Sequence, residues 1–387
     1  MSARFPEGFL WGASTSPHQV EGNNVTSDMW TLENQPDSPM QERSGDACDS
    51  LHRWPEDLDL LASVGLNAYR FGIEWARVEP EPGRVSAAML QHYRRMISGC
   101  IQRGITPVVT LHHFSSPRWF RAAGGWRAHD APELFARYAA TVLPILEGVE
   151  WVCTINEPNM IAIMQAAISS EQGLADLAAR MPPADEEITD GLIRAHRAAR
   201  AALSGVRSGW TVANLNVHAV DGAEVQAQAW RAQREDAFVD AAAGDDFIGV
   251  QAYTRTRVGP DGQLPPPDGA STTQTGWEVY PDGLEQAVRY TAQKVPGTPI
   301  LVTENGIATG DDRQRIDYTR RALAGLARAL QDGIDVRGYL HWSLLDNYEW
   351  GSFTPTFGLI AVDRQTFSRT LKPSARWLGE IARAGGP

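Results

Sequence analysis

The chain contains few cysteines, and this scarcity narrows the kind of protein it encodes. Its 387 residues include only Cys48, Cys100 and Cys153. Three widely spaced cysteines form neither an even disulfide set nor the paired-ligand pattern of a structural zinc site. The nine histidines also lack metal-ligand spacing. We therefore expect buried free thiols, no metal and no disulfide framework.

Long apolar runs and basic stripes are also lacking. No uninterrupted apolar stretch reaches the roughly 20 residues of a membrane span, and the first residues, MSARFPEGFLWGAS, do not resemble a signal peptide. The net charge of -12 disfavours a nucleic-acid partner, because binding a phosphate backbone requires clustered basic residues. We expect a cytoplasmic protein without membrane or nucleic-acid partners. Repeats, heptads and charged tails, which would support a scaffolding role, are absent as well.

Eight short apolar or β-branched runs alternate with segments of helical periodicity. The expected strands are Phe9–Thr15, Ala68–Trp75, Thr106–Phe114, Trp151–Glu157, Trp210–Ala219, Phe247–Thr254, Pro299–Glu304 and Val336–Leu344. The expected helices are Trp54–Val64, Ala87–Arg103, Pro132–Leu146, Thr189–Leu203, Glu224–Ala242, Gly283–Lys294, Arg313–Gln331 and Pro373–Ala384. The length permits one large barrel or two ordinary domains. Eight units without a linker predict an α/β protein with a single (β/α)8 TIM-barrel domain over residues 1–387.

Polar side chains gather at the ends of these expected strands. They are Glu74, His112, His113, Asn156, Glu157, Asn216, His218, Gln251, Tyr253, Glu304 and Trp342. A TIM barrel carries its active site at the C-terminal ends of its strands, so we expect these residues to line one mouth.

Two of the strand-end residues are glutamates. Pro158 should push Glu157 into an extended backbone at the end of its strand, and Gly306 should allow a sharp turn behind Glu304. A single glutamate at the end of a strand is more often an ion-pair or capping residue than a catalyst. As a pair across one barrel mouth they favour glycoside hydrolysis, which needs one acid and one carboxylate. A separation of about 5 to 5.5 Å predicts retention of configuration.

Six motifs make the sequence resemble glycoside hydrolase family 1, the retaining β-glucosidase family, from Phe9 to about Trp377. The motifs are FLWGASTSPHQVEG, YRFGIEWARVEP, LHHFSSPRW, TINEP, VTENG and WSLLDNYEW. The resemblance implies that Glu157 is the acid/base catalyst and Glu304 the nucleophile. Arg70 and Tyr253 match positions that would hold Glu304 as the anion, which would raise the pKa of the neighbouring carboxyl.

The resemblance also implies a set of sugar-binding residues. Asn156 would hydrogen-bond the 2-hydroxyl, Trp342 would stack beneath the ring, and the remaining hydroxyls would meet Gln19, His113, Glu349, Trp350 and Phe357. Trp119 and Trp277 are further candidates for the cleft. A carboxylate at Glu349 would repel a 6-phosphate, which disfavours the phospho-glycosidase branch. A cis peptide bond between Trp342 and Ser343 is a further expectation of the resemblance.

The sequence departs from the family pattern in several places. Gln251-Ala252-Tyr253 replaces the usual Asn-Tyr-Tyr, and GSFTPTFG replaces a more charged loop after Trp350. The segment between Glu157 and Glu304 is shorter than usual, which predicts trimmed loops and an open aglycone side. Residues 258–270 are rich in Gly and Pro, so we expect a mobile rim loop without regular structure, with a lid as the alternative.

We therefore expect a retaining exo-β-glycosidase, first of all a β-glucosidase, that acts on a small-molecule glycoside without a cofactor. Because of these departures from the family pattern, the preferred sugar could be glucose, galactose or fucose. A transglycosylase, or a tailoring glycosidase for a glycosylated metabolite, is the alternative within the enzyme class. A non-catalytic sugar-binding barrel is the alternative outside it, although both glutamates are present.

Overall fold

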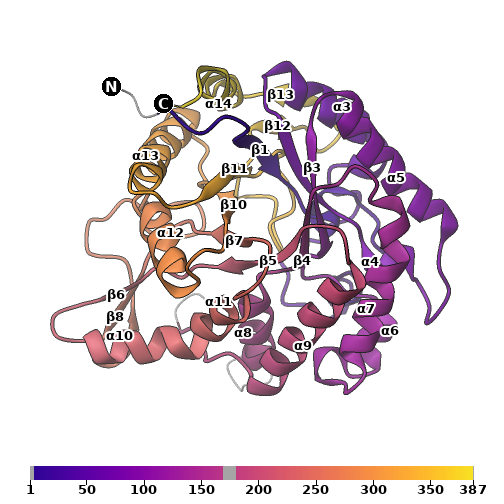
Figure 1. Cartoon of the computed structure of the whole chain (residues 1–387), viewed down its shortest axis with the longest axis horizontal. Helices are drawn as coiled ribbons and strands as arrows, with labels where there is room; N and C mark the ends of the chain where they lie inside the picture. The colour runs from indigo at the N-terminus through magenta and orange to yellow at the C-terminus, as the bar shows by residue number, and fades with distance from the viewer. Residues whose placement is uncertain (1–3, 169–179, 387) are drawn as a thin grey trace.

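A computed structural model describes residues 4–168 and 180–386, and eight parallel strands form a closed barrel at its centre (Figure 1). The strands are β1 (Leu10–Ser14), β2 (Ala68–Gly72), β3 (Thr106–His112), β4 (Trp151–Asn156), β5 (Ser208–Ala213), β7 (Ile248–Gln251), β10 (Ile300–Asn305) and β11 (Val336–Trp342). Their order around the barrel is β1-β11-β10-β7-β5-β4-β3-β2. Nearly every strand residue is buried, as expected of parallel strands covered on both faces. The predicted TIM barrel is confirmed.

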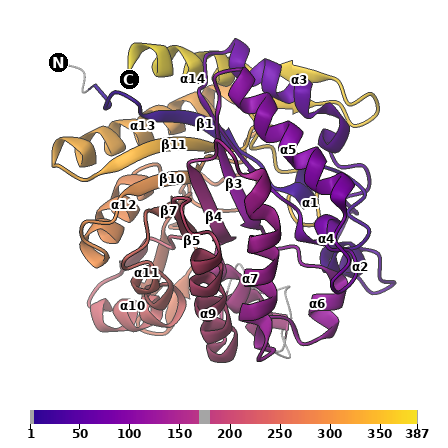
Figure 2. The same cartoon turned by 45° about the vertical axis from the view of Figure 1, so that its right-hand side comes forward.

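Helices follow the strands and cover the outside of the barrel, where α7 and α9 lie side by side (Figure 2). The longer helices are α3 (Ser50–Ser63), α5 (Ala87–Gln102), α7 (Ala131–Val142), α8 (Pro158–Ile168), α9 (Glu186–Ala202), α10 (Glu224–Arg231), α12 (Gly283–Lys294), α13 (Asp312–Gln331) and α14 (Pro373–Ala384). The short ones are α1 (Pro17–Val20), α2 (Asp28–Glu33), α4 (Trp75–Val78), α6 (Arg118–Ala122), α11 (Ala237–Ala241), η1 (Gly125–Arg127) and η2 (Leu143–Ile145).

Two expected elements are interrupted. The expected strand Trp210–Ala219 ends at Ala213, and β6 (Val217–Ala219) belongs to another sheet. Between the two strands, Asn216 adopts a left-handed backbone with φ of 45°, outside the extended region of strands. The expected helix Glu224–Ala242 contains a π-helical segment, η3 (Ala232–Asp236), between α10 and α11. Both interruptions follow β5 in the chain, and Glu235 in the π-helical segment accepts a hydrogen bond from Asn214 Nδ2 at 3.0 Å.

The Gly- and Pro-rich stretch is more regular than the sequence indicates. At its start, β8 (Thr256–Gly259) and β9 (Gly262–Leu264) form an antiparallel hairpin that pairs with β6 through β8. Gly262, with φ of 115°, supplies the turn that a residue with a Cβ rarely adopts. The expectation of a loop without regular structure is therefore wrong for residues 258–264. Two further small strands, β12 (Ile360–Val362) and β13 (Arg369–Leu371), pair beside the barrel.

The three cysteines are buried and free, as expected. Burial raises the pKa of Cys48 and of Cys100 to about 12, so both thiols stay protonated and unreactive at neutral pH. Within the described ranges, no helix is long and apolar enough to cross a membrane. The same residues contain no group of three or more side chains arranged to hold a metal ion.

Candidate active site

The two glutamates are presented by the C-terminal ends of β4 and β10. Glu304 is the penultimate residue of β10, and Glu157 directly follows β4. Glu157 has a left-handed backbone with φ of 44° rather than the extended one expected before Pro158. The proline still excludes the right-handed helical region, so α8 begins at Pro158. Gly306 has no positive φ; it is needed because a Cβ there would overlap the carbonyl oxygen of Trp342.

Glu304 is held by one cation and one phenol. Its Oε1 accepts a hydrogen bond from Arg70 Nη1 at 2.6 Å, and its Oε2 accepts one from the Tyr253 hydroxyl at 2.5 Å. Arg70 is fully buried on β2, so its charge is little screened by water. These contacts join β2, β10 and the end of β7 across the barrel. They provide the environment that a buried carboxylate needs to remain charged.

Burial raises the pKa of both Glu157 and Glu304, but only one of the rises is opposed by hydrogen bonds. At Glu304, the charge of Arg70 and the hydrogen bonds from Tyr253 and Arg70 lower the pKa again. At Glu157, burial and the negative charge of Glu304 together raise the pKa well above its usual value. The pair therefore shares its proton unevenly, with Glu157 as the acid and Glu304 as the anion.

Asn156 lies beside this pair with one end of its amide occupied and the other free. Its Oδ1 accepts hydrogen bonds from Arg70 Nη2 at 2.5 Å and from Gln251 Nε2 at 2.9 Å. Its Nδ2 is buried and has no partner among the residues that the structure describes. A buried donor without a partner is rare in proteins and is available to a ligand.

A second carboxyl pocket surrounds Glu349, on the loop after β11. Trp342 Nε1 donates to Glu349 Oε1 at 3.2 Å, and Gln19 Nε2 donates to Glu349 Oε2 at 3.1 Å. Burial of the carboxyl group raises the pKa of Glu349 to about 8, with a contribution from the charge of Glu304. The hydrogen-bonding partners are neutral, so Glu349 is mainly protonated at pH 7.

Aromatic rings wall this pocket. His113 stacks on Trp342 at 5.7 Å between centroids and on Trp350 at 6.3 Å. Burial lowers the pKa of His113 well below its usual range, helped by the charge of Arg70, so the imidazole is neutral. Phe357 is buried 5.9 Å from the Tyr253 ring. The expected cis peptide bond between Trp342 and Ser343 is present.

The two further tryptophan candidates lie in different places. Trp277 is 37% exposed, with its ring 5.7 Å from that of Tyr253 and 6.4 Å from that of Phe357. Its open face is next to the site. Trp119 on α6 instead packs edge-on against Trp75 and donates its indole N–H to the Glu79 carbonyl oxygen at 2.8 Å. These contacts hold the half-buried Trp119 against α4 and the residue that follows it.

Sequence reasoning missed several neighbours of the expected residues. His18 stacks flat on Trp350 at 5.8 Å, and Phe114 meets the same ring edge-on at 5.0 Å. Asn347 accepts a hydrogen bond from Gln19 at 3.0 Å. Each of them stands inside a quoted motif, next to or near a predicted residue. The motifs could have identified them as neighbours, but not their contacts.

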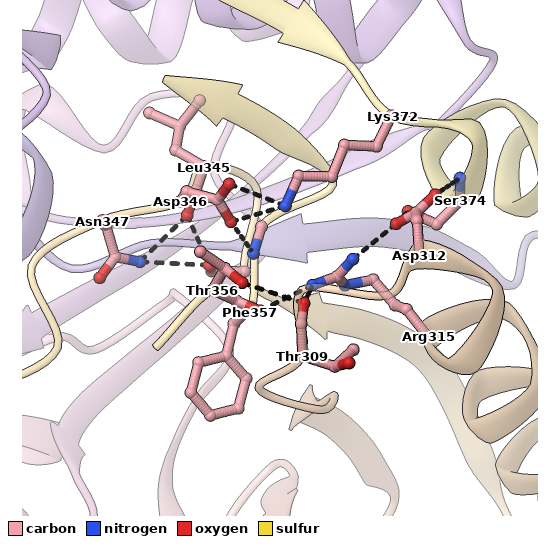
Figure 3. Close-up of polar contacts among 12 residues, drawn as sticks. Thr309, Asp312, Arg315, Leu345, Asp346, Asn347, Thr356, Phe357, Lys372 and Ser374 are labelled. Carbon is pink, nitrogen blue, oxygen red and sulfur yellow. Dashed lines mark hydrogen bonds and ion pairs between the residues drawn. The ribbon is translucent and has the colours of Figure 1, made fainter. Parts of the chain in front are cut away.

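The loop that carries Glu349 and Trp350 is fastened by ion pairs from distant segments (Figure 3). Lys372, just before α14, binds Asp346 with its Nζ 2.7 Å from Oδ2 and 2.8 Å from Oδ1. The same Oδ1 accepts the backbone N–H of Gly358 at 2.8 Å. Burial lowers the pKa of Lys372, and the charge of Asp346 opposes that shift.

Arg315 on α13 makes a second connection to this loop (Figure 3). Its Nη2 donates to the carbonyl oxygens of Thr309 at 2.7 Å and Thr356 at 2.6 Å. Asp312 pairs with Arg315 Nη1 at 2.5 Å and accepts from the backbone N–H of Ser374 at 2.7 Å. The loop after β11 is therefore tied to the start of α13 and the start of α14.

Comparisons with known proteins agree with this geometry. The family described as Glycosyl hydrolase family 1 matches residues 1–173 and 241–387. A crystal structure of the beta-glycosidase BGL167 superposes with a TM-score of 0.91 at 44% identity, covering 99% of this chain and 98% of that one. A beta-glucosidase from Agrobacterium sp. is 31% identical over 99% of this chain and 96% of its own length.

A further relative, a bifunctional beta-D-glucosidase/beta-D-fucosidase from Bifidobacterium breve, is 30% identical over 97% of this chain and 98% of its own length. The interval that the family does not match, residues 174–240, includes β5, β6 and the π-helical segment. The motifs of the two strand-end glutamates, TINEP and VTENG, lie inside the matched intervals. The chain belongs to glycosyl hydrolase family 1 and is a glycoside hydrolase with a (β/α)8 barrel.

Proposed function

We propose that this protein is a retaining exo-β-glucosidase that releases glucose from the non-reducing end of small β-D-glucosides. The observation that carries the proposal is the uneven environment of the two glutamates. Glu304 has a cation and a phenol to hold its charge, whereas the environment of Glu157 favours its proton. Glycosidase chemistry requires this division between nucleophile and acid.

In the first step, Glu304 attacks the anomeric carbon while Glu157 gives its proton to the departing glycosidic oxygen. A covalent glycosyl-enzyme forms, and the aglycone leaves as an alcohol. Glu157 is then ionised and takes a proton from water, whose oxygen attacks the same carbon and releases Glu304. Two inversions give net retention of configuration. Arg70 and Tyr253 stabilise the Glu304 carboxylate before attack and again as it leaves.

We place the sugar ring between the Glu157–Glu304 pair and the carboxyl group of Glu349. Asn156 Nδ2 would meet the 2-hydroxyl, Trp342 would lie beneath the ring, and Gln19, His113, Glu349, Trp350 and Phe357 would surround its other hydroxyls. A protonated Glu349 both donates and accepts hydrogen bonds, which suits neutral hydroxyls. A 6-phosphate would be excluded chiefly by the cost of its desolvation, because Glu349 with a pKa of about 8 carries little charge at pH 7.

Hydrolysis of nitrophenyl β-glucoside, β-galactoside and β-fucoside tests the activity directly. The proposal predicts that the protein hydrolyses the glucoside and that NMR detects β-glucose as the first product released. Glu304→Gln should abolish turnover, and azide should restore it to Glu157→Ala by attacking the glycosyl-enzyme. Silence on all three substrates, or initial release of the α-anomer, contradicts the proposal.

A tailoring glycosidase or transglycosylase for a bulky glycoside is the second candidate. The exposed ring of Trp277 beside Tyr253 favours it, since an apolar aglycone can stack there. Comparing the products formed with and without an alcohol acceptor separates transfer from hydrolysis. A preference for fucosides is also open, because the Bifidobacterium breve relative is named for both sugars.

Two broader proposals concern the whole chain. We infer that residues 1–387 form one catalytic domain, and the unbroken alternation of barrel strands and outer helices in the described ranges supports this. A cytoplasmic location stays a prediction from the sequence.

A further inference from the structure

Gln251 lies in the layer of side chains that supports the two catalytic glutamates. It is the last residue of β7, pairs in register with Glu304 on β10, and is 1% exposed. The family resemblance gives this position no role, and its usual residue there is asparagine. The contacts of this longer amide therefore need their own explanation.

The orientation of the amides around Gln251 follows from the chemistry of Arg70. A guanidinium can only donate, so Asn156 must turn its Oδ1 toward Arg70 Nη2, 2.5 Å away. Gln251 must then turn its Nε2 toward that oxygen, at 2.9 Å, because its own oxygen would be repelled. Its second N–H meets Thr211 Oγ1 at 3.2 Å, and Thr211 donates to Asn156 Oδ1 at 3.1 Å.

Three donors thus converge on Asn156 Oδ1 and fix the plane of the amide. Arg70 approaches from β2, Thr211 from β5 and Gln251 from β7. With the oxygen held, the Asn156 Nδ2 is directed away from this cluster and has no partner among the described residues. The Gln251 side chain is also one of the groups that lower the pKa of Glu304, after Arg70 and Tyr253, against the rise caused by burial.

This arrangement is costly for the fold. Gln251 Oε1 is buried and, within the described part of the chain, has no hydrogen-bond partner. An unsatisfied buried polar group destabilises the folded state, whereas an apolar side chain of the same shape avoids that cost. The two hydrogen bonds from Gln251 Nε2 offset this cost, so glutamine gives the fold little net stability over an apolar residue such as methionine. A side chain that contributes little net stability to the fold needs a reason in the site.

We propose that Gln251 is a positioning residue, which holds the Asn156 amide so that its Nδ2 meets the sugar hydroxyl beside the anomeric carbon. The inference rests on the proposed function, because that function assigns this hydroxyl to Asn156. Side-chain length is part of the argument. An asparagine at position 251 is one carbon–carbon bond, about 1.5 Å, shorter and would not reach Asn156 Oδ1 from β7.

The test compares Gln251→Met with the wild type on matched nitrophenyl glycosides with and without the 2-hydroxyl. The sugar is whichever of glucoside, galactoside or fucoside the wild type cleaves fastest, since all three carry the same equatorial 2-hydroxyl. We expect the loss of kcat/KM to be roughly tenfold greater on the 2-hydroxy substrate than on the 2-deoxy substrate, where the remaining loss reflects the effect of Gln251 on the pKa of Glu304. Tm should be unchanged or higher. Gln293→Met, at an exposed glutamine on α12, is the matched control and should change neither rate.

Equal losses on the two substrates, no loss on either, or a lower Tm for Gln251→Met contradicts the positioning role. A wild type that cleaves only the galactoside or fucoside contradicts the preference for glucosides and leaves this comparison intact. If the wild type cleaves none of them, the proposed function is wrong. Calorimetry then measures the binding of 1-deoxynojirimycin and of its 2-deoxy analogue to the wild type and to Gln251→Met. The variant should bind 1-deoxynojirimycin more weakly than the wild type and should bind the 2-deoxy analogue equally well. An equal loss of affinity for both compounds would overturn the positioning role of Gln251.

Discussion

Glu304 and Glu349 are two glutamates of one site whose hydrogen-bonding partners differ. Glu304 faces Arg70 and the Tyr253 hydroxyl, whereas Glu349 accepts hydrogen bonds from the neutral side chains of Gln19 and Trp342. Burial, with a contribution from the charge of Glu304, raises the pKa of Glu349 to about 8. The comparison shows how one barrel mouth can hold one carboxyl group as an anion and another as a neutral acid.

Replacing the cation should have the largest effect, because it makes the surroundings of Glu304 resemble those of Glu349. Arg70→Met removes the ion pair at 2.6 Å, which leaves Glu304 buried without compensation. Breaking a buried pair costs about 3–5 kcal/mol, so we expect Glu304 to take up a proton and kcat/KM at pH 7 to fall about 10²–10³-fold. The acid limb of the pH–rate profile should move to higher pH.

Tyr253→Phe is the control for Arg70→Met, because it removes one hydrogen bond and keeps the cation. A loss of about tenfold is expected for this variant. Equal pH–rate profiles for Arg70→Met and the wild type would show that Arg70 does not hold Glu304 as the anion.

Glu349→Gln sharpens the other half of the comparison. In the wild type, the pKa of Glu349 rises from 4.5 to about 8 on folding, so its contribution to stability is complete below pH 4.5 and is lost as pH rises through about 8. Glutamine cannot ionise. The stability advantage of the variant over the wild type should therefore grow between pH 5 and about 8, measured as Tm in matched buffers.

Activity of Glu349→Gln should fall about tenfold, mainly through KM, because glutamine still offers one donor and one acceptor. Asp363→Asn, at an exposed turn away from both pockets, is a suitable control, because its pKa is lowered by hydrogen bonds with Thr366 and it does not titrate above pH 5. A Tm difference between Glu349→Gln and wild type that does not change with pH would contradict the raised pKa.

The smallest effect is expected from the ion pair that fastens the Glu349 loop. Lys372→Met leaves Asp346 without its partner at 2.7 Å but keeps the hydrogen bond from Gly358. We expect KM to rise a few-fold with kcat nearly unchanged, because the loop positions binding groups and not the glutamates that react. A fall in kcat with constant KM, measured by initial rates, would place this loop in the chemical step.

Residues of the site also differ in how well the sequence predicts their placement. Glu304, Arg70 and Asn156 stand on barrel strands, so the alternation of strands and helices and the end positions of the strands place them together. The left-handed backbone of Glu157 was not predictable, since the proline excludes only the right-handed helical region and the tertiary structure chooses among the rest.

Contacts between distant segments are where prediction fails. Nothing in the local sequence pairs Lys372 with Asp346, or directs Arg315 to the Thr356 carbonyl oxygen, because such pairs depend on how helices close over the barrel. The hairpin of β8 and β9 was missed for a related reason. Its Gly and Pro content indicates a loop, whereas pairing with β6 stabilises a strand there.

Trapping with 2-deoxy-2-fluoro-β-glucosyl fluoride, followed by mass spectrometry of the digested protein, tests the division of roles most directly. The fluorine slows both steps, and the good leaving group lets the glycosyl-enzyme accumulate. We predict one sugar per chain, attached to the peptide that carries Glu304, and no label on Glu304→Gln. A sugar attached to Glu157, or turnover with inversion and no covalent adduct, would contradict the assignment of Glu304 as nucleophile and Glu157 as acid.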